Sequence, residues 1–164
     1  MRFKINEIGE EGLPLDVAIT SEWLETTCAD LGARPGPKGL RLRGRLSQSG
    51  DDYLLQARVS GALDTTCARC LEPARVSVDA PLVLTYVSAD EDDDVVAFAG
   101  NEIDLSDELR DEIFLAMPVK PLCEESCKGL CPVCGGNRNV VACLCEAKQR
   151  QAMSGLAALA KLKI

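Results

Sequence analysis

The chain has 164 residues and a net charge of −8, and 46% of its residues are hydrophobic while 27% are charged. These values are typical of a globular protein with one hydrophobic core, and no stretch approaches the roughly 20 apolar residues of a membrane-spanning helix. The first residues also lack the apolar run of a secretory signal, so we expect a cytoplasmic protein.

The N-terminal part of the chain predicts two short strands followed by a helix. Residues 3–8 and 14–20 are the strand candidates, since apolar and polar residues alternate along them. Residues 21–32 predict a helix, with Ser21 as its N-cap and Gly32 as its stop signal.

The middle of the chain predicts an antiparallel meander. RPGPKG at 34–39 is a loop that a helix cannot cross. Leucines and arginines then alternate over 40–46, and residues 53–66 and 74–86 continue the alternation of apolar and polar side chains. Turn-forming residues at 47–52 separate the first two runs. Three consecutive strands of this kind form a meander with one face toward water.

Acidic residues are concentrated between Asp90 and Glu112, where eleven acidic residues and one basic residue give a local charge of −10. The rest of the chain is therefore close to +2, so an acidic protein can still carry a basic binding face. A helix is expected to begin near Ser106, whose hydroxyl is a candidate cap, and to end at Pro118. Residues 147–164 predict a C-terminal amphipathic helix.

The chain contains nine cysteines and no histidine. Cys28 falls on the apolar face of the predicted helix and is most simply a small buried hydrophobe. Without a secretory signal, close cysteine pairs indicate metal ligands or redox thiols rather than disulfides. Eight ligands in pairs fit two four-cysteine zinc sites, because two residues between thiolates let one tight turn direct both sulfurs to one ion. The pairs are Cys67 and Cys70, Cys123 and Cys127, Cys131 and Cys134, and Cys143 and Cys145.

Two partitions of these thiols are open. In the first, which we favour, the last four cysteines close one site locally and the other four form the second site, so that the segments do not cross. In the second partition, Cys67 and Cys70 share an ion with Cys131 and Cys134. An iron–sulfur cluster also suits four thiolates, and a thioredoxin-like redox pair or disulfides are further alternatives.

Together these elements predict an α+β fold, an antiparallel β-meander with flanking helices and a cysteine-rich, zinc-binding C-terminal segment. We expect residues 1–118 to form the α+β core domain. Residues 119–146 form the zinc-binding segment, joined to the core through Cys67 and Cys70, and residues 147–164 follow as the amphipathic helix.

An enzyme is not expected. Four thiolates leave a zinc ion no open position for water, and the chain has no histidine to serve as a general base. We also find no phosphate-binding loop, no G-x-S-x-G motif and no pattern of paired carboxylates in a cleft.

Three stretches resemble the YceD family, the large ribosomal RNA subunit accumulation proteins: CARCLEP at 67–73, the run NEIDLSDELRDEIFLAMPVKPLCEESCKGLCPVCGGNRN at 101–139, and LAALAKLK at 156–163. The resemblance implies a mixed α+β protein of bacterial or plastid origin that takes part in large-subunit rRNA accumulation as an assembly or processing factor. Relatives often read CPxCGxNLN, so Arg138 and the CLC ending depart from the family pattern.

Three functional hypotheses follow. The first is a non-catalytic factor that contacts rRNA or a pre-ribosomal particle through a basic face, because arginine suits phosphate contacts. The second is an adaptor whose acidic segment docks a basic ribosomal or RNA-processing protein, and the third is a thiol switch that senses zinc or oxidants. For the basic face, the alternative is an ordinary solvated strand surface. Its candidate residues are Arg34, Lys38, Arg41, Arg43 and Arg45.

Overall fold

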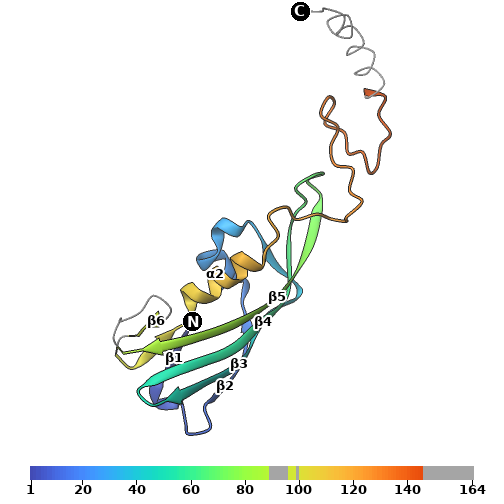
Figure 1. The fold of residues 1–164 in the computed structure, drawn as a ribbon. Helices are drawn as coiled ribbons and strands as arrows, with labels where there is room; N and C mark the ends of the chain where they lie inside the picture. The colour runs from blue at the N-terminus through green and yellow to red at the C-terminus, as the bar shows by residue number, and fades with distance from the viewer. Residues whose placement is uncertain (89–95, 99, 146–164) are drawn as a thin grey trace, which may run out of the picture.

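The structure, a computed structural model, describes residues 1–88, 96–98 and 100–145 (Figure 1). The acidic run at 90–94 and the predicted C-terminal helix at 147–164 lie outside these residues. Within the described part of the chain, no helix is long and apolar enough to cross a membrane.

The fold is mixed α+β with a mostly antiparallel sheet, as predicted. Three long strands follow one another along the chain, and within the described residues two α-helices flank them. In chain order the elements are β1 (Arg2–Lys4), η1 (Ile5–Glu7), β2 (Leu13–Ile19), α1 (Ser21–Thr27), η2 (Ala29–Leu31), β3 (Arg34–Ser49), β4 (Asp52–Thr66), β5 (Pro73–Val87), β6 (Val96–Ala97), β7 (Glu102–Asp104) and α2 (Ser106–Ala116).

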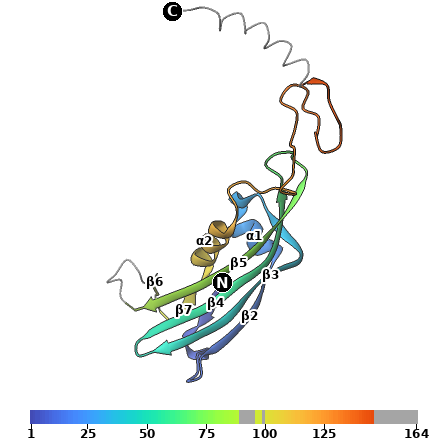
Figure 2. The same ribbon diagram turned by 45° about the vertical axis from the view of Figure 1, so that its right-hand side comes forward.

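The main sheet has the strand order β2-β3-β4-β5-β6, and β1 pairs with β7 in a separate ribbon. All neighbours are antiparallel except β5 and β6. The predicted meander is therefore confirmed, and its first turn is a tight one at Gly50 and Asp51, between the paired residues Ser49 and Asp52. Figure 2 shows α1 and α2 on the same side of this sheet.

The core lies between the sheet and the helices. Leu42, Leu55 and Val59 of the central strands are fully buried, and Leu24 of α1 and Ile113 of α2 cover them from the other side. Each such side chain contributes about 1.5 to 3 kcal/mol by leaving water. Because successive side chains of a strand point to opposite faces, the arginines of β3 lie on the other, exposed face of the sheet.

Both predicted helix caps are wrong by one residue, because the N-cap residues are Thr20 for α1 and Leu105 for α2. Thr20, in an extended conformation, caps α1, because its hydroxyl oxygen accepts a hydrogen bond from the Trp23 amide at 3.2 Å. At α2 the carboxylate of Asp104 accepts bonds from the Ser106 amide at 3.0 Å and from the Ser106 hydroxyl at 2.6 Å. The N-cap residue is Leu105, which makes no side-chain cap bond, so Ser106 is a donor at the start of the helix and not its cap, and the Asp104 carboxylate lies near the positive end of the helix, where a negative charge is favourable.

Two predicted strand boundaries also differ. Strand structure at the N-terminus stops at Lys4, and a short 3-10 turn follows it. RPGPKG is not a loop but the start of β3, where the register with β4 shifts between Pro35 and Leu40. A bulge of this kind places extra residues on one strand, so the two prolines are accommodated without ending the pairing.

At Gly44, strands β3 and β4 approach so closely that there is no room for a side chain. A Cβ atom at this position would lie 2.2 Å from the Gln56 carbonyl oxygen and 2.4 Å from the Ala57 Cα. Gly44→Ala is therefore expected to lower the free energy of unfolding by about 1 to 3 kcal/mol, because backbone must move to admit the methyl group. Urea denaturation measures the change. Gly9→Ala is the control, since nothing lies within 4 Å of its Cβ, and equal stabilities for the two variants would contradict the prediction.

Candidate metal centre

The structure brings eight of the nine cysteines into two groups. Within each group, all four sulfur atoms lie within 4.8 Å of one another. The grouping is that of the first partition, with sequential cysteines together. Cys28 is apart from both groups and is buried in the core, as predicted. The first group is Cys67, Cys70, Cys123 and Cys127, and the second is Cys131, Cys134, Cys143 and Cys145.

The first group joins the tip of the β4–β5 hairpin to the segment that follows α2 (Figure 1). Cys67 and Cys70 lie in the loop between the two strands. Their sulfurs are 3.8 Å from the Cys127 sulfur and 3.6 Å from the Cys123 sulfur, respectively. Three of the four thiols are buried, and Cys123 is exposed. Four convergent sulfurs that are mostly shielded from water are the donor set of a structural metal site.

Backbone hydrogen bonds hold the two segments together independently of the thiols. The Ala68 amide donates to the Pro121 carbonyl at 2.8 Å, and the Leu130 amide donates to the Arg69 carbonyl at 2.9 Å. The Arg69 guanidinium also donates to the Cys127 carbonyl at 2.9 Å. At Gly129 the backbones are so close that a Cβ atom would lie 2.9 Å from the Arg69 carbonyl oxygen. The scaffold of the first group is thus built from both segments.

Each CxxC motif forms the same closed turn. At the first, the Cys67 amide donates to the Glu72 carbonyl at 2.8 Å, and the Leu71 amide donates to the Cys67 carbonyl at 3.0 Å. Leu71 takes a left-handed conformation with φ 63°. Such a conformation costs a non-glycine residue about 1 to 2 kcal/mol, so the surrounding bonds must hold it in place.

The second CxxC motif repeats this turn with a glycine at the corresponding position. The Cys131 amide donates to the Gly136 carbonyl at 2.8 Å, and the Gly135 amide donates to the Cys131 carbonyl at 2.9 Å. Gly135 has φ 70°. Cys131 is buried, Cys134 is exposed, and the other two thiols of the group are partly exposed. The second group therefore has the more open surroundings.

Asn139 links the second loop back to the first group. Its side-chain amide donates to the Cys127 sulfur at 3.3 Å, and its side-chain oxygen accepts from the Lys128 amide at 2.7 Å. A bond to a ligand sulfur from a neighbouring amide orients that ligand and favours its thiolate form. The sequence alone did not single out Asn139, because its role depends on how the two loops meet.

The first thiol of each CxxC motif has a lowered pKa. Burial opposes ionisation of Cys67, but the backbone N–H groups of Cys70 and Arg69 lower its pKa to about 6. The N–H groups of Cys134 and Val133 likewise lower the pKa of Cys131 to about 6. These turns therefore present thiolates, the form in which cysteine binds metals.

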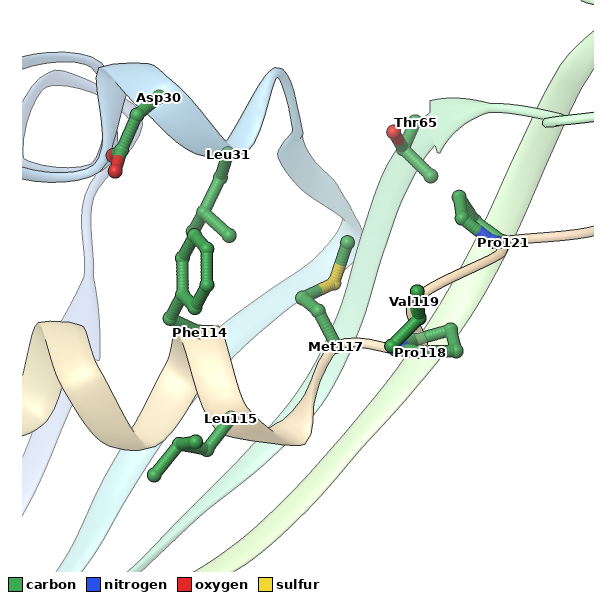
Figure 3. Close-up of a pocket in the computed structure, with 9 residues that line it drawn as sticks. All are labelled: Asp30, Leu31, Thr65, Phe114, Leu115, Met117, Pro118, Val119 and Pro121. Atoms are coloured by element: carbon green, nitrogen blue, oxygen red, sulfur yellow. The ribbon is translucent and has the colours of Figure 1, made fainter.

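A hydrophobic cavity of about 480 Å³ lies where the chain leaves α2 for the first cysteine group (Figure 3). Phe114 points toward Leu31, while Leu115 points away and is 78% exposed. Val119 is 97% exposed. Because this connecting segment buries little apolar surface, its position depends on the backbone bonds and thiols at the hairpin tip.

The predicted basic residues lie on β3. Arg41 and Arg43 extend over the exposed face of the sheet, where both donate to the Asp16 carboxylate, at 2.7 and 3.2 Å. The hydrogen bond from Arg41 is the main reason why the pKa of Asp16 is lowered. Arg45 donates to the Glu11 carbonyl.

Arg58 of β4 is a further basic residue on this face, and sequence reasoning missed it. It stands directly opposite Arg43 and forms an ion pair with Asp79 at 2.5 Å. The tight turn at residues 50 and 51 would have given this register from the sequence. We call the four residues Arg41, Arg43, Arg45 and Arg58 the arginine face.

The other two predicted basic residues lie further along β3. Arg34 stands opposite Asp64, whose carboxylate is held by Arg75 at 2.6 Å. Lys38 lies in the bulged part of β3 and is exposed. The structure thus brings three of the five predicted residues together on regular strand, and it separates Arg34 and Lys38 from them by the bulge.

Comparison with known protein families matches residues 55–163 to the model described as large ribosomal RNA subunit accumulation protein YceD. The match includes most of β4, all of β5 and α2, and both cysteine groups. No solved structure matches the chain.

Several curated proteins are similar to this chain. An uncharacterized protein of Mycobacterium tuberculosis is 32% identical over 119 residues, which cover 68% of this chain and 55% of that protein. The chain therefore spans about half the length of this relative. The large ribosomal RNA subunit accumulation protein YCED homolog 1, chloroplastic, of Zea mays is 41% identical over 59 residues, 35% of this chain and 20% of that protein. The uncharacterized protein YlbN of Bacillus subtilis is 26% identical over 165 residues, 98% of this chain and 93% of that protein.

The two cysteine groups predict the metal stoichiometry of single substitutions. Cys143→Ser and Cys67→Ser are each expected to lose one bound metal ion per chain, because each removes one sulfur from a different group of four. The difference between the native mass and the denatured mass of each variant, both measured by mass spectrometry, gives the number of bound ions. Cys28→Ser is the matched control and is expected to keep both. A variant that combines Cys67→Ser with Cys143→Ser is expected to lose both ions. Metal loss in the Cys28→Ser control, or loss of only one ion in the combined variant, would contradict two separate sites.

Proposed function

The chain belongs to the YceD family of large ribosomal RNA subunit accumulation proteins, and on that basis we propose that it is a non-catalytic, zinc-stabilised factor in the accumulation of large-subunit rRNA. It acts in the cytoplasm on rRNA or a pre-ribosomal particle. The single observation that carries the proposed contact is the arginine face, which gathers four guanidinium groups on the water-facing side of a rigid sheet.

Zinc is the proposed metal of both groups. Four cysteine sulfurs within 4.8 Å of one another suit zinc, and the two-residue spacing within the CxxC motifs is typical of structural zinc knuckles. The Arg69 amide also lies 3.4 Å from the Cys67 sulfur, which is the kind of N–H contact that stabilises a metal-bound thiolate. An iron–sulfur cluster would use the same donors, so elemental analysis and the absorption spectrum of the purified protein decide between the two.

The metal serves the shape of the protein in this proposal. All four ligand positions of each ion are taken by sulfur, so the ion has no place for a substrate water. Free thiols are needed for metal binding, and all nine cysteines lie within the described residues and are free. A reducing compartment such as the cytoplasm keeps them in that form.

The arginine face suits contact with an RNA backbone rather than with bases. Guanidinium groups bind phosphate oxygens through paired hydrogen bonds, whereas aromatic residues make up only 4% of the chain and give little surface for base stacking. Asp16 and Asp79 pair with three of these arginines. Exposed pairs of this kind are weak, so a phosphate can replace the carboxylate as the partner of the guanidinium group.

Changing Arg41, Arg43 and Arg45 together to Ser is expected to weaken RNA binding and to reduce the slope of log K against log salt by about 2 to 3, because each lost phosphate contact removes a released counterion. Filter binding of transcribed large-subunit rRNA fragments over a series of KCl concentrations measures both quantities. The control changes Arg2, Lys4 and Lys120 to Ser, which removes the same charge outside the arginine face. If the two triple variants bind alike, this face is not the site.

Asp16→Asn is expected to act in the opposite direction. The carboxylate of Asp16 competes with RNA phosphates for Arg41 and Arg43, so its neutralisation should tighten RNA binding about two- to fivefold and steepen the salt dependence. The same filter-binding assay reads the change. Asp51→Asn, in the turn between β3 and β4, removes an equal charge without contacting these arginines, and an equal gain in that variant would count against the proposal.

A further inference from the structure

Besides the cavity beside α2 (Figure 3), the protein has a pocket at the C-terminal end of β5. This end of the strand is the one away from the cysteine groups. The volume of the pocket is about 440 Å³, and its walls come from the C-terminal end of β5, the short strands β6 and β7, and the first turn of α2. Tyr86 is one of the inward-facing residues of β5, so the pocket is on the helix-covered side of the sheet and away from the arginine face. No function described above uses it.

Two buried polar atoms in this pocket have no hydrogen-bond partner. They are the phenolic oxygen of Tyr86 and the Oε2 atom of Glu108, and Tyr86 is only 1% exposed. Leaving such a group unpaired costs about 1 to 3 kcal/mol. Native proteins rarely keep such groups without a reason, and two of them lining one cavity indicate that a ligand supplies the missing partner.

The pocket is strongly acidic. Glu102, Asp104, Asp107 and Glu108 line it, and Arg2 is its only basic lining residue among the described residues. The Arg2 guanidinium is already bonded to Asp104 at 2.9 Å. The negative charge of the remaining carboxylates is therefore not neutralised within the pocket. Burial and the neighbouring acids also raise the pKa of Glu108, so a cation beside it would relieve an unfavourable charge.

One wall of the pocket is apolar and fixed in place. Val96 and Phe98 form it, and the Phe98 ring packs edge-on against Tyr53 with ring centroids 5.4 Å apart. A ligand that fits must therefore carry a hydrocarbon stem and end in a group with several hydrogen-bond donors. An ammonium or a guanidinium group on an alkyl chain meets both requirements, because it donates to a phenolic oxygen and a carboxylate at once.

We propose that this pocket binds the side chain of a lysine or arginine from a partner polypeptide, with Tyr86 and Glu108 accepting its hydrogen bonds. A divalent metal fits less well, because Mg²⁺ and Ca²⁺ need several convergent oxygen ligands, and among the described residues the carboxylates of this pocket do not converge closely enough to form such a group. The site would give the protein a binding surface for a basic protein in addition to the arginine face. It does not depend on RNA contact, and loss of function in the triple arginine variant leaves it unaffected.

The test is an NMR titration of the ¹⁵N-labelled full chain with the peptide acetyl-Gly-Lys-Gly-amide. Shifts are expected at Val96, Phe98 and Glu108, and the same peptide with norleucine in place of lysine should cause none. Glu108→Gln should weaken binding about tenfold, as expected for the loss of a charged hydrogen bond. Tyr86→Phe should weaken it about fivefold. Glu112→Gln removes the same charge from α2 outside the pocket and should bind as the unchanged protein does.

Thermal unfolding separates ligand binding from a structural role of Tyr86. Tyr86→Phe removes a buried hydroxyl that has no partner, so the variant without peptide should melt about 2 to 4 °C higher. With saturating peptide, the unchanged protein should melt as high as Tyr86→Phe, because the peptide then bonds to the Tyr86 hydroxyl. If the hydroxyl has only a structural role, the difference in melting temperature should stay the same with and without peptide. Equal shifts with the norleucine peptide, unaltered binding in Glu108→Gln, or shifts caused only by spermidine or Mg²⁺ would overturn the assignment to a basic polypeptide.

Discussion

The ladder that pairs β4 with β5 runs without interruption from Tyr53 opposite Tyr86 to Thr66 opposite Pro73, and both ends of the molecule take their positions from it. At one end the hairpin loop carries Cys67 and Cys70 to the first cysteine group. At the other end Tyr86 stands in the wall of the acidic pocket. The first cysteine group and the pocket therefore lie at opposite ends of this hairpin, and β3 adds the arginine face along its side.

Much of this fold follows from the period of two in the sequence. Leu40, Leu42 and Leu46 alternate with arginines, and a strand converts that alternation directly into a buried face and a wet face. The parts that the sequence predicted less well depend on competition between neighbours. At the start of α2 the hydroxyl of Ser106 could cap the helix, but it donates to the Asp104 carboxylate instead, and the N-cap residue is Leu105. In RPGPKG the prolines indicated a loop, but the pairing of β3 with β4 on both sides of the bulge prevailed.

The same distinction applies to the sites. The spacing of the cysteines predicted that they form groups, because CxxC geometry is local. The equivalence of the two turns was hidden, because Leu71 occupies the left-handed position that Gly135 occupies in the other. The pocket could not be predicted from the sequence at all. Tyr86 looks like any inward residue of a strand, and only the three-dimensional arrangement reveals that its hydroxyl has no partner.

The separation of the cysteines along the chain sets an order in which the two metal groups can assemble. Cys67 and Cys127 are 60 positions apart, and Cys70 and Cys123 are 53 apart, whereas the second group spans only residues 131–145. The entropic cost of closing a loop rises with its length, and the first group additionally needs the β4–β5 hairpin already formed. The second group can thus come together within one short segment, whereas the first comes together only when the β4–β5 hairpin meets the segment that follows α2. On the proposal that both groups bind metal, occupancy of the first group is therefore expected to depend on the folded sheet, and occupancy of the second is not.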